Sequence, residues 1–533
     1  MLTGNCAAWG RTDNINLPFR NDPAVLGSWK SVAYVRSISH FVPGRPPQAD
    51  LFFRGIVFLP NGKTPASGYS WTRGVVIDAN DRTAESYVIK KIGGLEYLFL
   101  QWKNGDYILH NRKPEYYVLV RAPDVAKISK MSGDPLNSGR NPIVLSKTDP
   151  YSACPYEGPG TLQRGTASEP SLAEGGPPGK RLMMALWEQD YIKRPDDNGA
   201  IGYVAASSRD SGRSWTEHAV PYGNCAGHPG DSLGNARVAI GPDGTAYIVG
   251  LASDGKSDIH LWLISSSNGG DSWTKARTEV IDPEDHCHSD EPSITANPVR
   301  AGWAYAAWTE VCFPGGKPQS DLWMTATSDF GRTWEGPRRI AVGGSDQTNW
   351  PIIAVHPDSP STLSLFFSRC RNYTHSGYSI NVATSSDSGL TWAASAVIAR
   401  GSGNWGPRPS AAIAPDGAVY VAWDKPSASR KILLARLPSK GRRWSKPRVA
   451  GRAHNDRPSL AITSKGLIAI FTRMSVEKSL DGGKTFSKPA SLGYLSPPNG
   501  FAGDYIISAV SDGSHLHAVF ECAIAGRNSV CFR

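Results

Sequence analysis

The sequence contains no apolar run long enough to cross a membrane and no long block of basic residues. The first absence argues against a membrane span. The second argues against nucleic acid as a partner, although 57 basic and 47 acidic residues give a net charge of +10. None of the eight cysteines has the spacing of zinc ligands. The first residues, MLTGNCAAWGRTDN, also lack the apolar segment of a signal peptide.

What the sequence does contain is a repeated turn. Residues 207–216 read SSRDSGRSWT, and similar strings begin at residues 266, 327, 385 and 479, with a degenerate copy at 437. Their anchor positions, separated by 42 to 61 residues, are Asp210, Asn268, Asp329, Asp387, Ser439 and Asp481. The aspartate can accept hydrogen bonds from backbone N–H groups of a tight turn, and the glycine can take a positive φ. We call this element the Asp turn; its repetition predicts a structural element rather than six active sites.

A second repeat of short apolar strands runs in phase with the Asp turns. Entrances such as SEPSLA at residue 168 and DRPSLA at residue 456 start units of three strands, an Asp turn and a fourth strand. Four strands per unit at this period predict an all-β propeller. We count seven units, with six as the alternative. The seventh lacks an outer strand, and NPIVLSK, beginning at residue 141, is expected to supply it and close the ring.

These turns and units resemble the Asp-box, or bacterial neuraminidase repeat (BNR), of the sialidase-like β-propellers. The resemblance covers about residues 140 to 533. It implies a propeller fold and a carbohydrate ligand. The same repeat occurs in sialidases, other glycoside hydrolases, polysaccharide lyases and non-catalytic binders, so the fold alone does not give the function.

The first quarter of the chain has no Asp turn. Strand-like runs lie within residues 25–35, 51–64, 74–78, 84–110 and 115–121, with NGK, IGG and NGD turns. They predict a small antiparallel β-barrel that resembles lipocalin-like domains, with a Gly-x-Trp in LGSWK near its start. We therefore divide the chain into an extension (1–24), the barrel (25–121), a linker (122–139) and the propeller (140–533).

In a propeller the inner strands converge on the central axis, so the loops that enter them line one mouth of a shared funnel. Acids, arginines, amides and aromatic residues occupy these entrances. They are Glu169, Arg237, Asp290, Glu291, Asn349, Trp350, Arg408, Asp456, Arg457, Asp504 and Tyr505, with Asp231 and His288 just upstream. A salt bridge around the axis would explain any one of these residues, but their accumulation indicates a site.

Arginines suit the site to a carboxylate, because a guanidinium group binds both carboxylate oxygens at once. Resemblance to sialidases implies the following roles: Arg237, Arg408 and Arg457 hold the sugar carboxylate, Tyr505 is the nucleophile with Glu291 as its partner, and Asp231 or Asp290 is the acid/base. The other funnel residues would contact the glycan. The chain departs from sialidases at GTASEPSLA, where Glu169 stands in place of an arginine motif, and in its count of seven units against their six.

Two other interpretations stay open beside a sialidase-type exo-glycosidase acting on an acidic glycan. Some seven-bladed relatives act on rhamnose–glucuronate linkages as lyases or rhamnosidases; here His288 or Tyr505 would be the base, and Asp290, Glu291 and Asp504 would hold a Ca²⁺ ion. The third interpretation is a non-catalytic binder of glycan or protein. It would show the funnel acids and arginines paired with one another.

The remaining expectations concern cysteines, cofactor and location. Cys522 and Cys531 flank a predicted hairpin, and Cys287 and Cys312 flank strands of one unit, so disulfides and free thiols are both open. No cofactor is expected apart from the optional Ca²⁺. Family habit and the cysteines suggest a secreted or periplasmic protein, and a monomer is expected.

Overall fold

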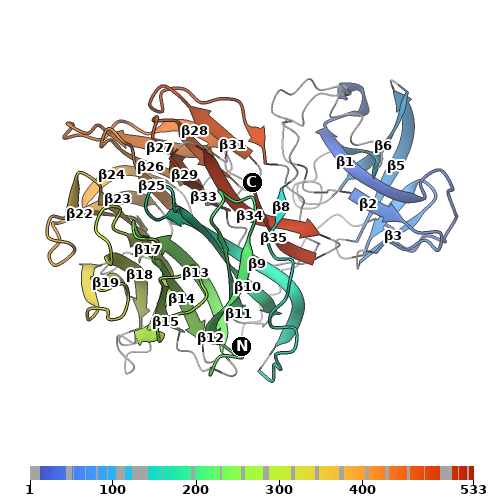
Figure 1. Ribbon diagram of the computed structural model, residues 1–533. Coiled ribbons are helices and arrows are strands. Elements are labelled where there is room, and N and C mark those ends of the chain that lie inside the picture. Colours follow the sequence, from blue (N-terminus) through green and yellow to red (C-terminus); the bar gives the residue numbers. More distant parts are fainter. Residues whose placement is uncertain are drawn as a thin grey trace, which may run out of the picture. The chain divides into compact units, whose positions relative to one another are not determined.

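The computed structural model describes most of the chain in two compact units, residues 1–140 and 141–533. The described residues are 13–41, 43, 51, 53, 55–65, 68–79, 82–92, 94–103, 114–122, 142–158, 160–193, 199–228, 231–253, 259–279, 287–313, 319–342, 347–370, 377–402, 407–425, 431–452, 457–472, 475–492, 507–513, 515–524 and 527–533. Apart from one short 3-10 helix, all regular secondary structure in this part of the chain is β-strand, as the sequence predicted (Figure 1).

The first unit is one antiparallel sheet that curls toward a barrel. Its elements are β1 (Gly27–Val35), η1 (Ile38–His40), β2 (Gly55–Phe58), β3 (Tyr69–Thr72), β4 (Val75–Asp78), β5 (Thr83–Ile92), β6 (Leu95–Trp102) and β7 (Glu115–Arg121). The strand order is β2-β1-β7-β6-β5-β4-β3. An isolated bridge between Lys63 and Ser70 brings the two edges close to closure. Large buried side chains, among them Trp29, Phe58 and Trp71, pack into one core cluster.

The Gly-x-Trp motif at the start of the barrel is held by the end of its last strand. The Arg121 guanidinium lies 4.2 Å from the centroid of the Trp29 ring and donates hydrogen bonds to the carbonyls of Leu26 and Ala24. A cation over an indole face is a favourable contact, so this arrangement ties β7 to the beginning of β1.

The second unit is a β-propeller whose described strands fall into seven four-stranded groups by pairing. The groups are β9 (Thr161–Gly175), β10 (Leu182–Lys193), β11 (Gly199–Ser208) and β12 (Thr216–Gly223); β13 (Ser232–Ile240), β14 (Ala246–Ser253), β15 (Ile259–Ser266) and β16 (Arg277–Glu279); β17 (His288–Ala296), β18 (Ala304–Cys312), β19 (Gln319–Thr327) and β20 (Arg338–Val342); β21 (Gln347–His356), β22 (Ser359–Cys370), β23 (Tyr378–Ser385) and β24 (Ala396–Gly401); β25 (Pro409–Ile413), β26 (Val419–Asp424), β27 (Lys431–Leu437) and β28 (Arg448–Arg452); β29 (Ser459–Ile462), β30 (Ile468–Phe471), β31 (Ser475–Ser479) and β32 (Ala490–Ser491); and β33 (Ile507–Ser511), β34 (Leu516–Ile524) and β35 (Arg527–Phe532) with β8 (Ile143–Val144). A single bridge, Ala200 to Leu233, joins the first two groups.

Five of the six Asp turns have the hydrogen bonds that the sequence predicted. Asp210 Oδ1 accepts the Ser214 N–H at 2.9 Å and Oδ2 accepts the Ser214 hydroxyl at 2.6 Å, while the Gly212 N–H donates to Ser208 Oγ at 2.9 Å. Gly212 takes a φ of 79°, which favours glycine. These bonds favour the ionised form and lower the pKa of Asp210 to about 2. Corresponding bonds recur at Asn268, Asp329, Asp387 and Asp481.

The last group is completed by the beginning of the unit, as predicted. Cys531 and Phe532 of β35 pair with Val144 and Ile143 of β8, which lies beside β35 in Figure 1. Serine hydroxyls link neighbouring inner strands as well, and Ser508 Oγ accepts the Leu172 N–H at 3.0 Å, across the junction between the last group and the first. Pairing with β8 covers the outer edge of β35 and joins the two ends of the unit.

Leu145 tests this closure. Its side chain is 2% exposed within a core cluster built from both ends of the unit, and its N–H donates to the Val530 carbonyl. We expect Leu145→Ala to lower the free energy of unfolding by about 2–5 kcal/mol, because it leaves a cavity at the junction. Denaturant unfolding measures this change. Leu390→Ala, at a side chain that is 56% exposed, is the control; an equal effect at both positions would contradict the closure.

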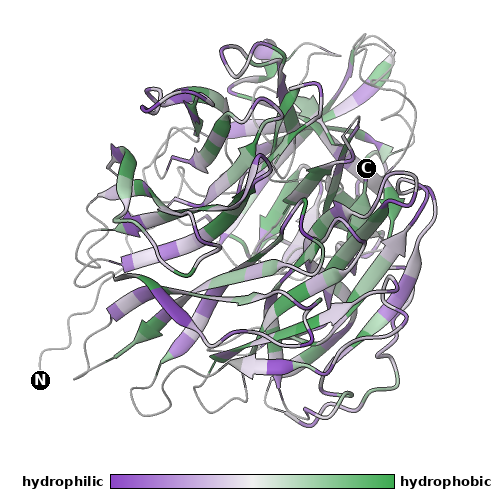
Figure 2. Cartoon of the chain, turned by 60° about the vertical axis from the view of Figure 1, so that its left-hand side comes forward, coloured by the Kyte–Doolittle hydropathy of each residue, from purple (hydrophilic) through white to green (hydrophobic). Residues whose placement is uncertain are grey.

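Three disulfides form in the propeller. Cys287–Cys312 and Cys522–Cys531 join the two pairs that the sequence singled out. Cys154–Cys225, with a separation of 71 residues, was not foreseen; its cysteines lie in the connections before β9 and after β12. In Figure 2 green (hydrophobic) bands lie mainly on the strands, which also carry purple (hydrophilic) bands. No helix in the described part of the chain is long and apolar enough to span a membrane.

Candidate functional site

The site begins with a β-bulge that recurs in four inner strands. In β9, β13, β17 and β21, two residues face one residue of the neighbouring strand. The first bulged residues are Glu169, Asn235, Glu291 and Trp350, with φ of 47°, 54°, 54° and 61°. Positive φ is uncommon for residues other than glycine and is often found at functional sites. A bulge redirects the side chain of the bulged residue and is common next to active sites, so we take these four positions as candidates for the site.

Five of the residues predicted from the sequence line one pocket of about 170 Å³. They are Arg237, Glu291, Trp350, Arg408 and Arg457. They come from five different four-stranded groups. Arg408 and Arg457 immediately precede the prolines that open the inner-strand segments of their groups, the position that Glu291 and Trp350 occupy before Pro292 and Pro351. The repeat therefore places distant residues around one axis.

Trp350 and Glu291 lie beside the arginines. The Cζ atoms of Arg457 and Arg408 are 4.0 and 4.4 Å from the centroid of the Trp350 ring. Arg457 Nη2 is 4.0 Å from Glu291 Oε2, and their side chains are only 13% and 12% exposed. The indole ring thus lies against two guanidinium groups. One of them, that of Arg457, also lies at the limit of ion-pair distance from the Glu291 carboxyl group.

The charges in this pocket are partly desolvated. Burial raises the pKa of Glu291 well above its ordinary value and Asp290 adds to this, while Arg457, Arg408 and Arg237 oppose it. Burial also lowers the pKa of Arg237, and the charge of Arg457 adds to this. Perturbed acids in a concave site are candidates for proton transfer, and clustered guanidinium groups are suited to binding an anion.

Three acids that the sequence analysis missed hold the backbone of the site. Glu188 Oε1 accepts the Asn235 N–H at 2.8 Å, Glu521 Oε1 accepts the Glu169 N–H at 3.0 Å, and Asp424 Oδ1 accepts the Arg408 N–H at 2.7 Å. A signal was present in the sequence. Each acid follows an aromatic residue in the second strand of its group, in Trp187-Glu188, Trp423-Asp424 and Phe520-Glu521.

Other predicted residues lie on neighbouring strand ends and are not among the described residues that line this pocket. Asp290 Oδ1 accepts the Glu291 N–H at 2.7 Å. His288 stacks on Phe313 with ring centroids 5.7 Å apart. The Asn349 carbonyl accepts the Ser368 hydroxyl at 3.3 Å.

Glu169 contributes to the electrostatic environment of Arg237 and Glu188. Asp456, Asp504 and Tyr505 lie outside the described residues. Among the described residues no group of three or more His, Cys, Asp or Glu is placed to hold a metal ion. Since Asp504 is not among them, the optional Ca²⁺ stays an expectation.

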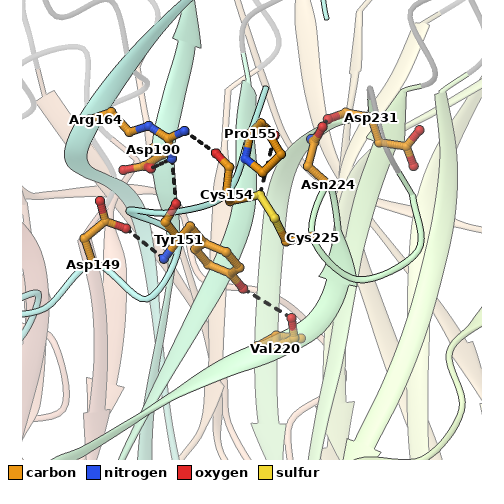
Figure 3. The surroundings of a disulfide bond; sticks show 10 residues. All are labelled: Asp149, Tyr151, Cys154, Pro155, Arg164, Asp190, Val220, Asn224, Cys225 and Asp231. Carbon is orange, nitrogen blue, oxygen red and sulfur yellow. Dashed lines mark hydrogen bonds and ion pairs between the residues drawn. A yellow bond between two sulfur atoms is a disulfide. The ribbon is translucent and has the colours of Figure 1, made fainter. Parts of the chain in front are cut away.

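Asp231 lies on a braced loop (Figure 3). Its carbonyl accepts the Asn224 amide at 2.5 Å, and its carboxylate is 3.7 Å from His228 Nδ1. The disulfide Cys154–Cys225 ties this loop to the segment before β9. That segment is in turn held by Arg164, which donates to Asp190 at 2.9 Å and to the Cys154 carbonyl. The loop that carries a predicted acid is therefore anchored by covalent and ionic contacts.

Comparisons with known proteins agree with the fold. Residues 302–519 match the family model described as BNR repeat-like domain. Together with the strand topology, this match shows that the second unit contains a BNR repeat-like domain within a β-propeller. No curated protein sequence matches the chain.

Similar solved structures share little sequence with the chain. They include the Hadza microbial sialidase Hz136 (15% identity, covering 96% of this chain and 90% of that one, TM-score 0.43). An α-L-arabinofuranosidase, Arb93A of Fusarium graminearum, has 17% identity over 56% of this chain and 92% of its own, with a TM-score of 0.43. Trypanosoma rangeli sialidase has 14% identity over 74% and 59%, with a TM-score of 0.41. Such low values transfer none of these activities.

Proposed function

We propose that this chain is a carbohydrate-active enzyme that takes an acidic glycan into the pocket around the propeller axis. One observation carries the proposal: Arg237, Arg408 and Arg457, which come from three groups of strands, line the same pocket as Glu291. Among the described lining residues, three guanidinium groups therefore meet one carboxyl group. A ligand carboxylate would balance this excess of positive charge and accept paired hydrogen bonds from a guanidinium group.

The proposed reaction is that of a sialidase-type exo-glycosidase. Tyr505 attacks the anomeric carbon while its phenolic proton passes to Glu291, and Asp231 or Asp290 gives a proton to the departing oxygen. Water then cleaves the glycosyl–tyrosine bond, and the acid returns as the base. Ile507, which follows Tyr505 by two residues in the sequence, lines the pocket. Tyrosine is a weak nucleophile, so a nearby carboxylate is needed to take its proton.

A lyase acting on rhamnose–glucuronate linkages is the second candidate, and the raised pKa of Glu291 favours it. A glutamic acid that keeps its proton to higher pH can donate a hydrogen bond to the uronate carboxylate and stabilise the enolate. His288 or Tyr505 would then remove the proton beside that carboxylate. A rhamnosidase would use the same uronate contacts but release rhamnose.

The proposal extends to location and assembly. Three disulfides suit an oxidising compartment, so we propose a secreted or periplasmic protein. We also propose a monomer, which size-exclusion chromatography with light scattering would test.

A substrate panel tests the function. Sialylated oligosaccharides, rhamnose–glucuronate oligosaccharides and neutral arabinan fragments are incubated with the full chain. Released sialic acid, released rhamnose and the absorbance of an unsaturated uronate are then measured. We expect turnover of one acidic class only. Turnover of a neutral fragment alone would contradict the acidic substrate, and tight binding without product would favour a binding protein.

A further inference from the structure

Trp350 is the one aromatic residue among the described residues that line the pocket. The centroid of its ring lies 4.0 Å from Arg457 Cζ and 4.4 Å from Arg408 Cζ, and both arginines line the same pocket. The φ of Trp350 is 61°, a left-handed conformation that is rare for a bulky residue and costs free energy. The fold therefore maintains a strained backbone at the residue whose ring contacts two of the three arginines.

The contact with Trp350 stabilises both guanidinium groups. The face of an indole ring attracts a cation, and this attraction is stronger where water is largely excluded. The side chain of Arg457 is only 13% exposed. Two like charges in one small pocket repel each other, so a ring that attracts both of them offsets part of that repulsion.

Holding the arginines in place before a ligand arrives matters for affinity. An arginine side chain has many rotamers, and fixing them during binding costs free energy. A carboxylate accepts paired hydrogen bonds only from a guanidinium group that is correctly oriented. Arginines that already pack against a ring lose less freedom when the carboxylate binds, because part of the cost was met during folding.

We propose that Trp350 is a positioning residue that holds Arg408 and Arg457 ready for the carboxylate of the ligand and thereby sets the preference for an acidic sugar over an uncharged one. This inference rests on the proposed function, since it requires an acidic ligand. It assigns Trp350 a role that acts through the arginines, whereas the sequence analysis expected this residue to contact the glycan.

The test compares two ligands that differ only in charge. An array of sialylated, glucuronate-containing and neutral oligosaccharides identifies the acidic glycan that the full chain binds most tightly. Calorimetric titration then gives the Kd for this glycan and for the same glycan with its carboxylate converted to a primary amide. The ratio of the Kd for the amide to the Kd for the acid measures the preference for charge.

Trp350→Leu removes the ring without introducing a β-branched side chain at the left-handed position. We expect it to lower this ratio about tenfold, because two arginines lose their support, and to leave the Kd for the amide unchanged. Trp350→Phe keeps an aromatic face that attracts cations less strongly than indole, so the ratio should fall less. Thermal melts establish which variants are folded, and Trp350→Phe carries the test if Trp350→Leu is not.

Phe330→Leu is the matched control. Phe330 also has a positive φ, of 67°, and its ring centroid lies 5.7 Å from Arg332 Cζ. It belongs to an Asp turn and is not among the described residues that line the pocket. The same substitution at this position should leave both Kd values unchanged.

Each outcome decides between the proposals. A lower ratio with an unchanged Kd for the amide supports the role of Trp350. Equal weakening of both ligands would mean that the ring contacts the sugar itself, which overturns this role and leaves the acidic substrate standing. An unchanged ratio in every folded Trp350 variant also overturns it. If the parent protein binds the amide as tightly as the acid, or binds no acidic glycan, both the acidic substrate and the role of Trp350 are wrong.

Discussion

Replacing Arg457 by alanine is expected to lower kcat/KM on the acidic substrate by at least about 30-fold. Arg457 is mostly buried, lies 4.0 Å from the Trp350 ring centroid and from Glu291 Oε2, and lines the pocket. Its loss removes one donor to the ligand carboxylate and leaves Glu291 with less positive charge nearby. Truncating one member of a buried charge pair costs about 2–5 kcal/mol, which is the basis of this estimate. Steady-state kinetics with the substrate found in the panel measures it.

Two variants make this result interpretable. Arg457→Lys keeps the charge but not the planar fork, so part of the activity should return. Arg448→Ala removes an exposed arginine on β28 that is not among the described residues lining the pocket, and should leave kcat/KM unchanged. Thermal melts establish that each variant is folded. If Arg457→Ala were folded and fully active, the arginines would serve only to brace the strands, and the proposed site would be wrong.

The features that the sequence predicted well are local. The hydrogen bonds of an Asp turn join residues only a few positions apart, as between Asp210 and Ser214. Its motif can therefore be recognised without any tertiary information. The closing strand was predictable for a related reason: a unit with three strands has an open edge, and residues near 141 offered an unassigned strand. The pairing of β8 with β35 follows from that logic.

The candidate site was predictable only in part. Arg408, Arg457 and Glu291 stand before a proline in equivalent strand entrances, and equivalence under the repeat is enough to bring them to one axis. Asn235 was missed because Ala236 replaces that proline, so the register of its bulge appears only once β13 is paired with β14. The acids that hold the backbone were missed because their role depends on contacts to other strands, such as Glu521 with Glu169.

The first unit illustrates a second limit of sequence patterns. Residues before β1 contain no repeat, yet several of them contact the barrel. Asp13 forms an ion pair with Lys103 at 2.8 Å, Phe19 packs edge-on against Trp71, and Asp22 accepts the Tyr87 hydroxyl at 3.0 Å. Contacts of this kind join residues about 50 to 90 positions apart, so no local sequence pattern predicts them.

Glu291→Gln is expected to lower kcat by about 10²–10⁴-fold and to remove the acid limb of the pH–rate profile. If Glu291 takes the proton of the nucleophile, only its ionised form is active. Activity should therefore rise with pH through the raised pKa of Glu291, so that the midpoint lies above that of an ordinary glutamate. In a lyase that uses the protonated acid, activity would instead fall through the same pKa. The sign of the limb distinguishes the two candidate reactions.

The pH dependence of stability gives an independent measure of the titration of the Glu291 carboxyl group. A carboxyl group with a pKa raised by folding binds its proton more tightly in the native state, so stability falls as pH rises from the ordinary glutamate pKa to the raised one. Glutamine does not titrate and should flatten this slope in melting temperature against pH. Glu310→Gln is the matched control, since burial raises the pKa of Glu310 to about 7 and it does not line the pocket. It should flatten the stability slope between about pH 4.5 and pH 7 and leave the acid limb in place. Loss of the limb in Glu310→Gln, or its survival in Glu291→Gln, would assign the titration to another residue.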